Sequence, residues 1–594
     1  MAIRLTDTVR DMRTSQTGRW YKLTLLLLFF TLAVYGLYLL VYVLYARSVF
    51  SFPFDYDQGE GFELYDAVRL ARGENIYLDN SVFPFYSSNY PPVYRTLLVP
   101  LVWLFGPKLW PARAFTFACS LMIGVLIFIA ARRQLTSPLS SPSLAQRHSL
   151  ISSSPHLLTL LIPLISALSF FAANYVYQIA PLARAHLPMV MFALAGAVCL
   201  ERGLDDRPPT TGVSPAMVGR RSSVVAFLGI FLLMTAGFTK LQAIDGLAAG
   251  FAFLLLRRPK AFGVASLVCI TVTAFIVLGM NALSGGQFWV NVVAANVNEY
   301  VIENTWATYG QWFSLQAPLI ICSLIYVLWD VILAVRARSW QPITLWSLYF
   351  VTGSAMGMLT GKWGAGPAYL IAAIAVSCIC TVGLIGRVGG WAQGRGQSVE
   401  SRKYAKRAEG GEQPYLLTAH NFLPSTLCML ASLIFLAQAS RNIHLPVTGR
   451  VFGPLARLVG VADQPSVYPP YPYYDSIGYT QLGHFLDPAD IENGWALVHR
   501  LQQVNGPVLS EEAMLTLWAG KDVVSNPTQL LNLYKNGTLD TSRMITMIRA
   551  RKFGAVVFRA QFYPGDVKEA IVENYAWTHM YRINGFEYWI LLPP

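Results

Sequence analysis

The chain has few charged residues. Only 13% of its 594 residues are charged, and 54% are hydrophobic. A soluble domain carries about 25% charged residues. The composition therefore excludes an ordinary soluble protein and predicts a polytopic membrane protein. Lysine and arginine outnumber aspartate and glutamate by 45 to 32, but no motif favours nucleic acid. We therefore interpret the net charge of +13 mostly as a signal of membrane topology.

Cysteine is also scarce. All seven cysteines lie in predicted apolar runs, so none is available to cross-link a domain outside the membrane. Cys378 and Cys380 are two positions apart and would not share a helix face, which argues against a metal pair. Packing inside the membrane is the better interpretation for all of them.

Long apolar runs are abundant. The first, from Leu23 to Ala46, is long enough to cross a bilayer and is preceded by five basic residues, which predicts an uncleaved anchor with a cytoplasmic N-terminus. About eleven transmembrane helices are predicted, the others near 110–131, 157–173, 187–200, 223–240, 243–256, 261–283, 315–334, 342–360, 367–386 and 418–437. Residues 93–105 are apolar but short, and could either cross or lie at the interface.

The positive-inside rule favours the alternative in which 93–105 does not cross, because the basic loops then all face the cytoplasm. The segments 47–109, 284–314 and 438–594 would then face outward. We predict a transmembrane domain over 1–437, a Pro/Tyr-rich linker over 438–490, and an extracytoplasmic α/β domain over 491–594. Within that last domain we expect strands near 507–509, 555–558, 578–583 and 587–592, and helices near 527–535, 541–551 and 565–574.

Three carboxylates follow the first apolar run within six residues: Asp55, Asp57 and Glu60. Carboxylates at a membrane surface must be hydrated, paired or functional, because removing their water costs several kcal/mol or more. From Glu60 to Arg72 polar residues recur every third position, and Gly73 follows. This pattern predicts an amphipathic helix lying on the membrane, which would hold the acidic cluster against the outer surface.

Several short motifs surround this cluster: Leu70-Ala71-Arg72-Gly73 with Tyr77, then Tyr90-Pro91-Pro92, then Phe105-Gly106 and Arg113. With the acidic pair, they resemble the GT-C glycosyltransferases, in the branch that contains protein O-mannosyltransferases and lipid A aminoarabinose transferases. The resemblance is strong over roughly 20–135 and weaker beyond. It implies a GT-C-like fold and a lipid-linked sugar donor at the outer face. The family's catalytic aspartate corresponds to Asp57, with Glu60 second and Asp55 third.

The chemistry that the resemblance implies fits these residues. A polyprenyl phosphate leaves readily, whereas the acceptor hydroxyl needs a base, so Asp57 would act as the base and the anomeric carbon would be inverted. The Asp55-Tyr56-Asp57 tripeptide also matches the DxD motif of nucleotide-sugar enzymes, but the predicted topology puts it on the wrong side for nucleotide sugars. A divalent cation, Mg²⁺ or Mn²⁺, that bridges Asp57 or Glu60 to phosphate is a further alternative.

The donor phosphate should have cationic partners on the same face. The topology supplies Lys362, Arg184, His186 and Lys240, in that order of preference, because the glycines around Lys362 allow close backbone approach. Snorkelling toward lipid headgroups is the alternative for each cation, and a structural role is the alternative for His186. Tyr90, Tyr94 and Arg95 would form the substrate loop, and Trp306 and Tyr309 could stack on sugar rings. We interpret Trp312 and Trp363 as interface anchors.

The sequence thus predicts an inverting glycosyltransferase that uses a polyprenyl-phosphate sugar and a glycan, lipid or protein acceptor in a bacterial or archaeal cell membrane. For the C-terminal domain, including Ser510-Glu511-Glu512, we favour structural or acceptor-recognition roles. Two other classes stay open: a lipid or glycan transporter or flippase, and a non-catalytic glycan-binding membrane protein. Charges near the helix ends and the lack of internal repeats count against a transporter.

Overall fold

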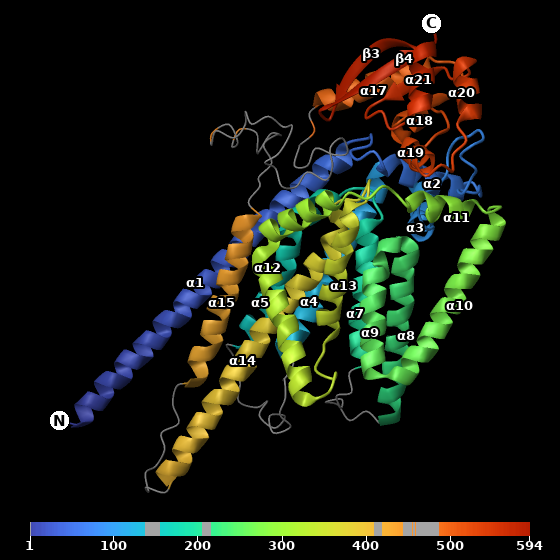
Figure 1. The fold of residues 1–594 in the computed structure, drawn as a ribbon. Helices are drawn as coiled ribbons and strands as arrows, with labels where there is room; N and C mark the ends of the chain where they lie inside the picture. The colour runs from blue at the N-terminus through green and yellow to red at the C-terminus, as the bar shows by residue number, and fades with distance from the viewer. Residues whose placement is uncertain are drawn as a thin grey trace.

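A bundle of long helices carries a small α/β domain at one end (Figure 1). The computed structural model describes residues 2–136, 155–204, 215–408, 419–442 and 488–594, with a few single positions between them. The Pro/Tyr-rich segment 468–474 lies outside the described residues. The start of the first helix and the α/β domain lie at opposite ends of the bundle (Figure 1).

The described part of the bundle is helical almost throughout. Its longer helices are α1 (Ala2–Ser51), α4 (Leu109–Thr136), α5 (Pro155–Ala172), α7 (His186–Gly203), α8 (Pro215–Thr239), α9 (Ile244–Arg257), α10 (Pro259–Leu283), α12 (Ile302–Ala337), α13 (Leu345–Ala355), α14 (Ile371–Ala408) and α15 (Ala419–Arg441). Short helices join them: α6 (Asn174–Ile179), η2 (Leu241–Ala243), α11 (Gln287–Val292), η3 (Ala294–Asn296), η4 (Met356–Gly361) and η5 (Pro367–Leu370).

The chain is an integral membrane protein. Within the described residues, five helical segments are long and apolar enough to cross a bilayer: Lys22–Ser51, Leu109–Thr136, Pro259–Leu283, Ile302–Ala337 and Pro367–Trp391. Shorter apolar helices cover Val93–Phe105, Leu160–Ala172, Ser223–Thr239 and Thr426–Arg441. The predicted apolar runs coincide with helices of the bundle, while the number of eleven crossings stays a prediction.

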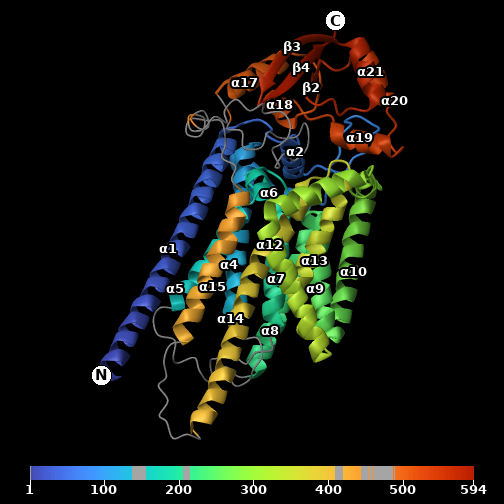
Figure 2. The same ribbon diagram turned by 60° about the vertical axis from the view of Figure 1, so that its left-hand side comes forward.

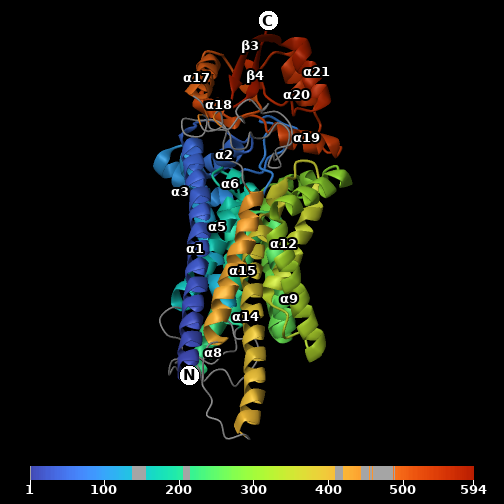
Figure 3. The same ribbon diagram turned by 90° about the vertical axis from the view of Figure 1, so that its left-hand side faces the viewer.

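Two helices form a separate layer at the end of the bundle. Helix α2 (Glu60–Ala71) ends before Gly73, whose φ of +74° suits glycine. Helix α3 (Val93–Phe105) packs beside α2 near the α/β domain, not among the long helices (Figure 3). This placement fits the interfacial alternative for 93–105. The helix predicted from Glu60 is confirmed, but of its polar stripe only Arg72 is exposed, because residues 60–68 are all buried.

The α/β domain contains a four-stranded sheet in the order β1-β2-β4-β3. Its elements are α17 (Pro488–Gln502), β1 (Val508–Ser510), α18 (Ala513–Trp518), α19 (Pro527–Lys535), α20 (Ser542–Arg549), β2 (Ala555–Phe558), α21 (Gly565–Asn574), β3 (Ala576–Ile583) and β4 (Phe586–Leu592). β1 and β2 run parallel with Leu509 opposite Val556, and β4 is antiparallel to both β2 and β3. The predicted strands and helices are all present, whereas α17 and α18 were not predicted.

The α/β domain rests directly on the acidic loop and α2 (Figure 2). Ala513 and Val523 share a buried apolar cluster with Phe62, Tyr65, Val68 and Tyr86 of the segment between α1 and α3. The Trp495 ring packs edge-on against Phe54, with ring centroids 5.3 Å apart. Each large apolar side chain buried in such a cluster contributes about 1.5–3 kcal/mol. The domain is therefore docked through a continuous apolar contact and forms a lid over the loop.

Candidate active site

Glu60 and Arg113 form the buried foundation of the acidic loop. The Arg113 guanidinium donates from Nε to Glu60 Oε1 at 2.8 Å and from Nη2 to Oε2 at 2.7 Å, and both side chains are fully buried. Burial alone would raise the pKa of Glu60, but the charge and hydrogen bonds of Arg113 lower it below the ordinary value. This bidentate pair keeps Glu60 ionised inside the protein.

The other hydrogen bonds of Glu60 and Arg113 fix the backbone of the loop. Glu60 accepts hydrogen bonds from the backbone amides of Tyr56, Asp57 and Ala183 at 3.0, 3.2 and 2.6 Å. Arg113 donates to the carbonyl oxygens of Val49, in the last turn of α1, and of Phe52 and Phe54 in the loop. The Glu60–Arg113 pair therefore sets the path of residues 49–60 and the position of Asp57.

Asp57 is paired with a cation from another part of the chain. Arg184 Nε lies 3.1 Å from Asp57 Oδ2, and the two side chains are 14% and 5% exposed. Gly59 makes this approach possible, because a Cβ at that position would overlap the Arg184 guanidinium. The carboxylate that the sequence ranks first thus lies beside a cation that was predicted to hold phosphate.

Asp55 turns away from Asp57 and toward the α/β domain. Its carboxylate accepts hydrogen bonds from the backbone amides of Gly61 at 2.5 Å and Met514 at 3.0 Å. Burial raises the pKa of Asp55 to about 6, although hydrogen bonds from the Glu512 side chain and from Met514 oppose the shift. Glu512 is in turn paired with Arg559 at 2.6 Å. Asp55 therefore belongs to the junction between loop and domain.

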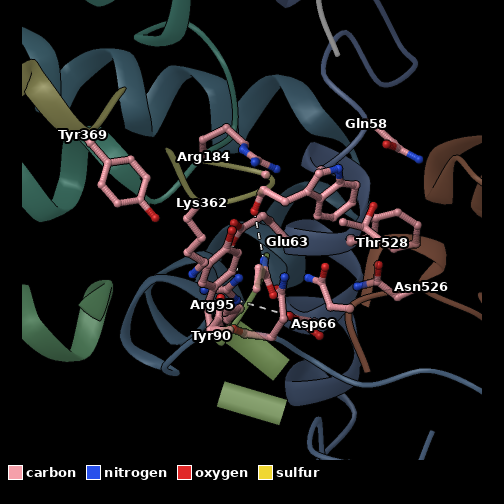
Figure 4. A pocket seen from close by; sticks show the side chains of 18 residues that line it. Gln58, Glu63, Asp66, Tyr90, Arg95, Arg184, Lys362, Tyr369, Asn526 and Thr528 are labelled. Carbon is pink, nitrogen blue, oxygen red and sulfur yellow. Dashed lines mark hydrogen bonds and ion pairs between the residues drawn. The ribbon is translucent and has the colours of Figure 1, made fainter. Parts of the chain in front are cut away.

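A small cavity of about 80 Å³ lies between α2, the segment 89–95 that contains Tyr90-Pro91-Pro92, the 362–369 turn and the α/β domain. Eighteen residues line it, among them Arg184, Lys362, Tyr90 and Arg95, and Figure 4 shows these four around one space. Gln58 and Gly59 bring the acidic loop to its rim.

The cations around the cavity differ in their partners. Lys362 reaches the cavity with no ionic or hydrogen-bonding partner for its ammonium group among the described residues, and burial lowers its pKa. Lys240 lies one layer further back, where its ammonium donates to His186 Nε2 at 2.9 Å and sits 4.8 Å from the centre of the Tyr90 ring. Lys362 and Arg184 line the cavity, while Lys240 lies against the Tyr90 ring and His186 contacts Lys240.

Arg95 is held by two carboxylates of α2. It pairs with Glu63 at 2.5 Å and with Asp66 at 3.2 Å, and all three side chains are at most 3% exposed. Its guanidinium also lies over the Tyr90 ring at 5.0 Å. Tyr90 is thus held between Arg95 and Lys240, in a fixed orientation at the cavity wall.

Other residues predicted for the substrate loop lie elsewhere. Tyr94 is fully buried and hydrogen bonds to Thr116, so it does not line the cavity. Trp306 is 63% exposed on α12, and Tyr309 donates to the Ser354 carbonyl at 2.7 Å. Neither Trp306 nor Tyr309 lines the cavity, whereas Trp363, interpreted from the sequence as an interface anchor, does.

Sequence reasoning missed the uncharged polar part of the lining. It comprises Asn89, Asn296, Asn298, Asn526, Thr528 and Asn532. The only sequence signal for it is the density of asparagine between 291 and 298, because isolated amides in distant segments have no recognisable spacing.

No group of three or more His, Cys, Asp or Glu side chains positioned to hold a metal ion occurs within the described residues. All the oxygens of Glu60 already accept hydrogen bonds or ion pairs, and Asp57 is occupied by Arg184. In this arrangement Glu60 has no capacity left for a metal ion. The divalent cation considered from the sequence therefore stays a prediction, with Asp57 and not Glu60 as its candidate ligand.

The fold is that of the GT-C glycosyltransferases, as the sequence resemblance predicts. The apo structure of ArnT from Cupriavidus metallidurans matches with a TM-score of 0.51 and 12% identity, over 95% of this chain and 97% of that one. The same enzyme bound to undecaprenyl phosphate matches with a TM-score of 0.50 and 12% identity, over 94% and 98%. An oligosaccharyltransferase of Archaeoglobus fulgidus in the apo form gives 0.47 and 11% identity, over 92% and 73%. No family model and no curated sequence matches the chain, so the likeness is one of fold.

Proposed function

We propose that this protein is a membrane glycosyltransferase that moves a sugar from a polyprenyl phosphate to an acceptor hydroxyl. The observation that carries the proposal is the position of Asp57, a nearly buried carboxylate 3.1 Å from Arg184, beside a cavity that Arg184 and Lys362 both line. A base and two phosphate ligands are the groups that this reaction requires. The ArnT fold, with one structure bound to undecaprenyl phosphate, supports the same donor class.

In the proposed reaction, Asp57 accepts the proton of the acceptor hydroxyl as its oxygen forms a bond to the anomeric carbon. The bond between that carbon and the phosphate oxygen breaks, and its electron pair stays on the phosphate. Arg184 and Lys362 stabilise the charge that develops there. Attack opposite the leaving phosphate inverts the anomeric carbon.

Arg184 would interact with both the Asp57 carboxylate and the donor phosphate. It pairs with Asp57, so a bound phosphate would compete for the same guanidinium. Binding of the donor would thereby release the carboxylate for its role as base. Glu60 would act as a positioning residue, because Arg113 and three backbone amides occupy its oxygens.

Asp57→Asn tests the proposal. With purified protein and a radiolabelled polyprenyl-phosphate sugar, we expect transfer to fall by on the order of 100-fold or more, since a missing general base costs at least that. Asp79→Asn is the matched control, because Asp79 is an exposed acid of the same loop outside the cavity. Undiminished transfer by Asp57→Asn would contradict the proposal.

The same assay separates the alternatives. A flippase would move the labelled lipid between leaflets of a vesicle without transferring sugar, and a glycan-binding protein would do neither. We propose that the N-terminus is cytoplasmic and that the α/β domain and acidic loop face outward, in the membrane of a bacterial or archaeal cell. A sugar transferred at that face would be attached to a glycan, lipid or protein acceptor.

A further inference from the structure

One side of the cavity consists of uncharged amide and hydroxyl groups. Asn89, Asn296, Asn298, Asn526, Thr528 and Asn532, here called the amide wall, come from three segments far apart in the sequence. The last three belong to α19 and its N-cap in the α/β domain. In Figure 4, Asn526 and Thr528 lie across the cavity from Tyr369 and Arg184. The cavity therefore has a cationic side and an amide side.

Two amide oxygens of this wall are buried without a partner among the described residues. Asn532 is only 7% exposed, and its Oδ1 accepts no hydrogen bond. Asn298 donates from Nδ2 to the Trp363 carbonyl at 2.9 Å, but its Oδ1 also has no partner. A buried acceptor without a donor is unfavourable, so both positions call for a ligand that brings hydrogen-bond donors.

The charges of the lining restrict that ligand. Its only carboxylates are Glu63 and Asp66, and both pair with Arg95 instead of facing the amide wall alone. No charged group lies within the amide wall itself. An ammonium group on the ligand would meet no counter-charge there, whereas hydroxyl groups match the acceptors and donors that asparagine and threonine offer.

An aromatic ring borders the amide wall. Trp363 lines the cavity, and residues of the α/β domain hold its indole: Phe562, with ring centroids 6.0 Å apart, and Lys535, whose ammonium lies 5.2 Å from the ring centre. An indole beside amide groups suits a sugar ring, which presents an apolar C–H face and polar hydroxyl edges.

We infer that the amide wall and Trp363 form a subsite for the ring of a neutral, hydroxyl-rich sugar carried by the donor lipid. This inference rests on the proposed function, in which Arg184 and Lys362 hold the phosphate to which the ring is attached. The α/β domain then selects the donor sugar, through Thr528 and Asn532. A donor whose sugar bears an amino group is disfavoured.

The test uses the full-length protein in nanodiscs and three probes: undecaprenyl phosphate, undecaprenyl-phosphate hexose, and undecaprenyl-phosphate aminopentose. Dissociation constants are measured by calorimetry. We expect the wild type to bind the hexosyl lipid roughly 10-fold more tightly than undecaprenyl phosphate, as two or three net hydrogen bonds would give. The aminopentosyl lipid should bind less tightly than the hexosyl lipid.

The double variant Thr528→Val/Asn532→Leu keeps side-chain volume but removes hydroxyl and amide groups. Its preference for the hexosyl lipid should shrink to about 3-fold or less, since those hydrogen bonds are gone. Its affinity for undecaprenyl phosphate should stay unchanged, which also shows that the site is folded. Asn574→Leu is the matched control, an asparagine of the same domain that donates to Ala570 far from the cavity. Thr528→Val alone, at a half-buried position, should reduce the preference for the hexosyl lipid by less than the double variant does.

The outcomes separate the two proposals. If the double variant retains the full preference for the hexosyl lipid, or if the wild type prefers the aminopentosyl lipid, the subsite inference is overturned while the proposed function stands. A changed KM for the acceptor with unchanged donor binding would place an acceptor sugar on the amide wall and also overturn it. A wild type that binds none of the lipids overturns the proposed function and this inference together.

Discussion

Asp55 Oδ2 accepts a hydrogen bond of 3.0 Å from the backbone amide of Met514, a residue 459 positions further along the chain. The Glu512 side chain also hydrogen bonds to Asp55. Two buried carboxyl groups in contact must share a proton or repel each other. The junction between the acidic loop and the α/β domain is therefore sensitive to protonation.

This contact predicts a pH dependence of stability. Burial raises the pKa of Asp55 from 3.8 to about 6 in the folded protein, so folding favours its protonated form. The resulting stabilisation is complete below about pH 4 and is lost as the pH rises through about 6. We expect the thermal unfolding midpoint of the wild type to fall over this interval by more than that of Asp55→Asn. Equal pH profiles for the two proteins would contradict this assignment.

The Glu60–Arg113 pair predicts a change in stability that is distinct from a change in catalysis. Either Glu60→Leu or Arg113→Met alone leaves a buried charge without a partner, which typically costs about 3–5 kcal/mol. Both single variants should unfold at lower temperature than Asp57→Asn, which should unfold close to the wild type. The double variant Glu60→Leu/Arg113→Met should be more stable than either single variant. A single variant with normal stability and no activity would instead make Glu60 a catalytic residue.

Lys362 predicts a pH-dependent loss of donor binding. Burial lowers the pKa of its ammonium group, so undecaprenyl phosphate should dissociate at alkaline pH values where an exposed lysine is still charged. Lys362→Met should weaken binding by roughly 10-fold or more, as expected for a lost charge-assisted hydrogen bond. Lys362→Arg should restore much of the affinity and flatten the pH profile. Lys108→Met, which removes an exposed lysine in the connection between α3 and α4, should bind normally.

Membrane orientation can be measured directly. Cysteines introduced at two exposed positions, Glu573 in the α/β domain and Arg336 at the far end of α12, should react differently with an impermeant maleimide in intact cells. We expect labelling of Glu573→Cys and none of Arg336→Cys until the membrane is opened. The reverse pattern would invert the predicted topology.

Local features of the fold were predictable, and the reasons are physical. Apolar length identifies a membrane helix regardless of its neighbours, and β-branched runs such as Ala555–Phe558 identify buried strands. The burial of α2 was not predictable, because its amphipathic pattern suits a membrane surface and a protein interface equally. Only the position of Ala513 and Met514 beside α2 distinguishes the two.

The charged residues of the site were predictable from the sequence, but their partners were not. Asp57, Arg184 and Lys362 stand out because charges are rare in an apolar chain, and the structure brings all three to one region. The order of the acids does not reveal that Glu60 faces Arg113 while Asp55 faces Glu512, since those partners are distant in sequence. Asparagines such as Asn532 carry no comparable signal, as polar neutral residues are common in outer loops.

The shared walls of the cavity have a consequence for biosynthesis. Tyr90 leaves the ribosome long before Asn532 does, and at 5–20 residues per second the interval is roughly 20–90 s. Throughout that time the nascent chain holds the acidic loop without the residues that close the cavity over it. A chain that stalls before α19 would insert into the membrane yet remain inert, so the protein would gain its proposed activity only when synthesis is nearly finished. Ribosome-arrested chains ending before and after residue 535, assayed for binding of undecaprenyl-phosphate hexose, should differ accordingly.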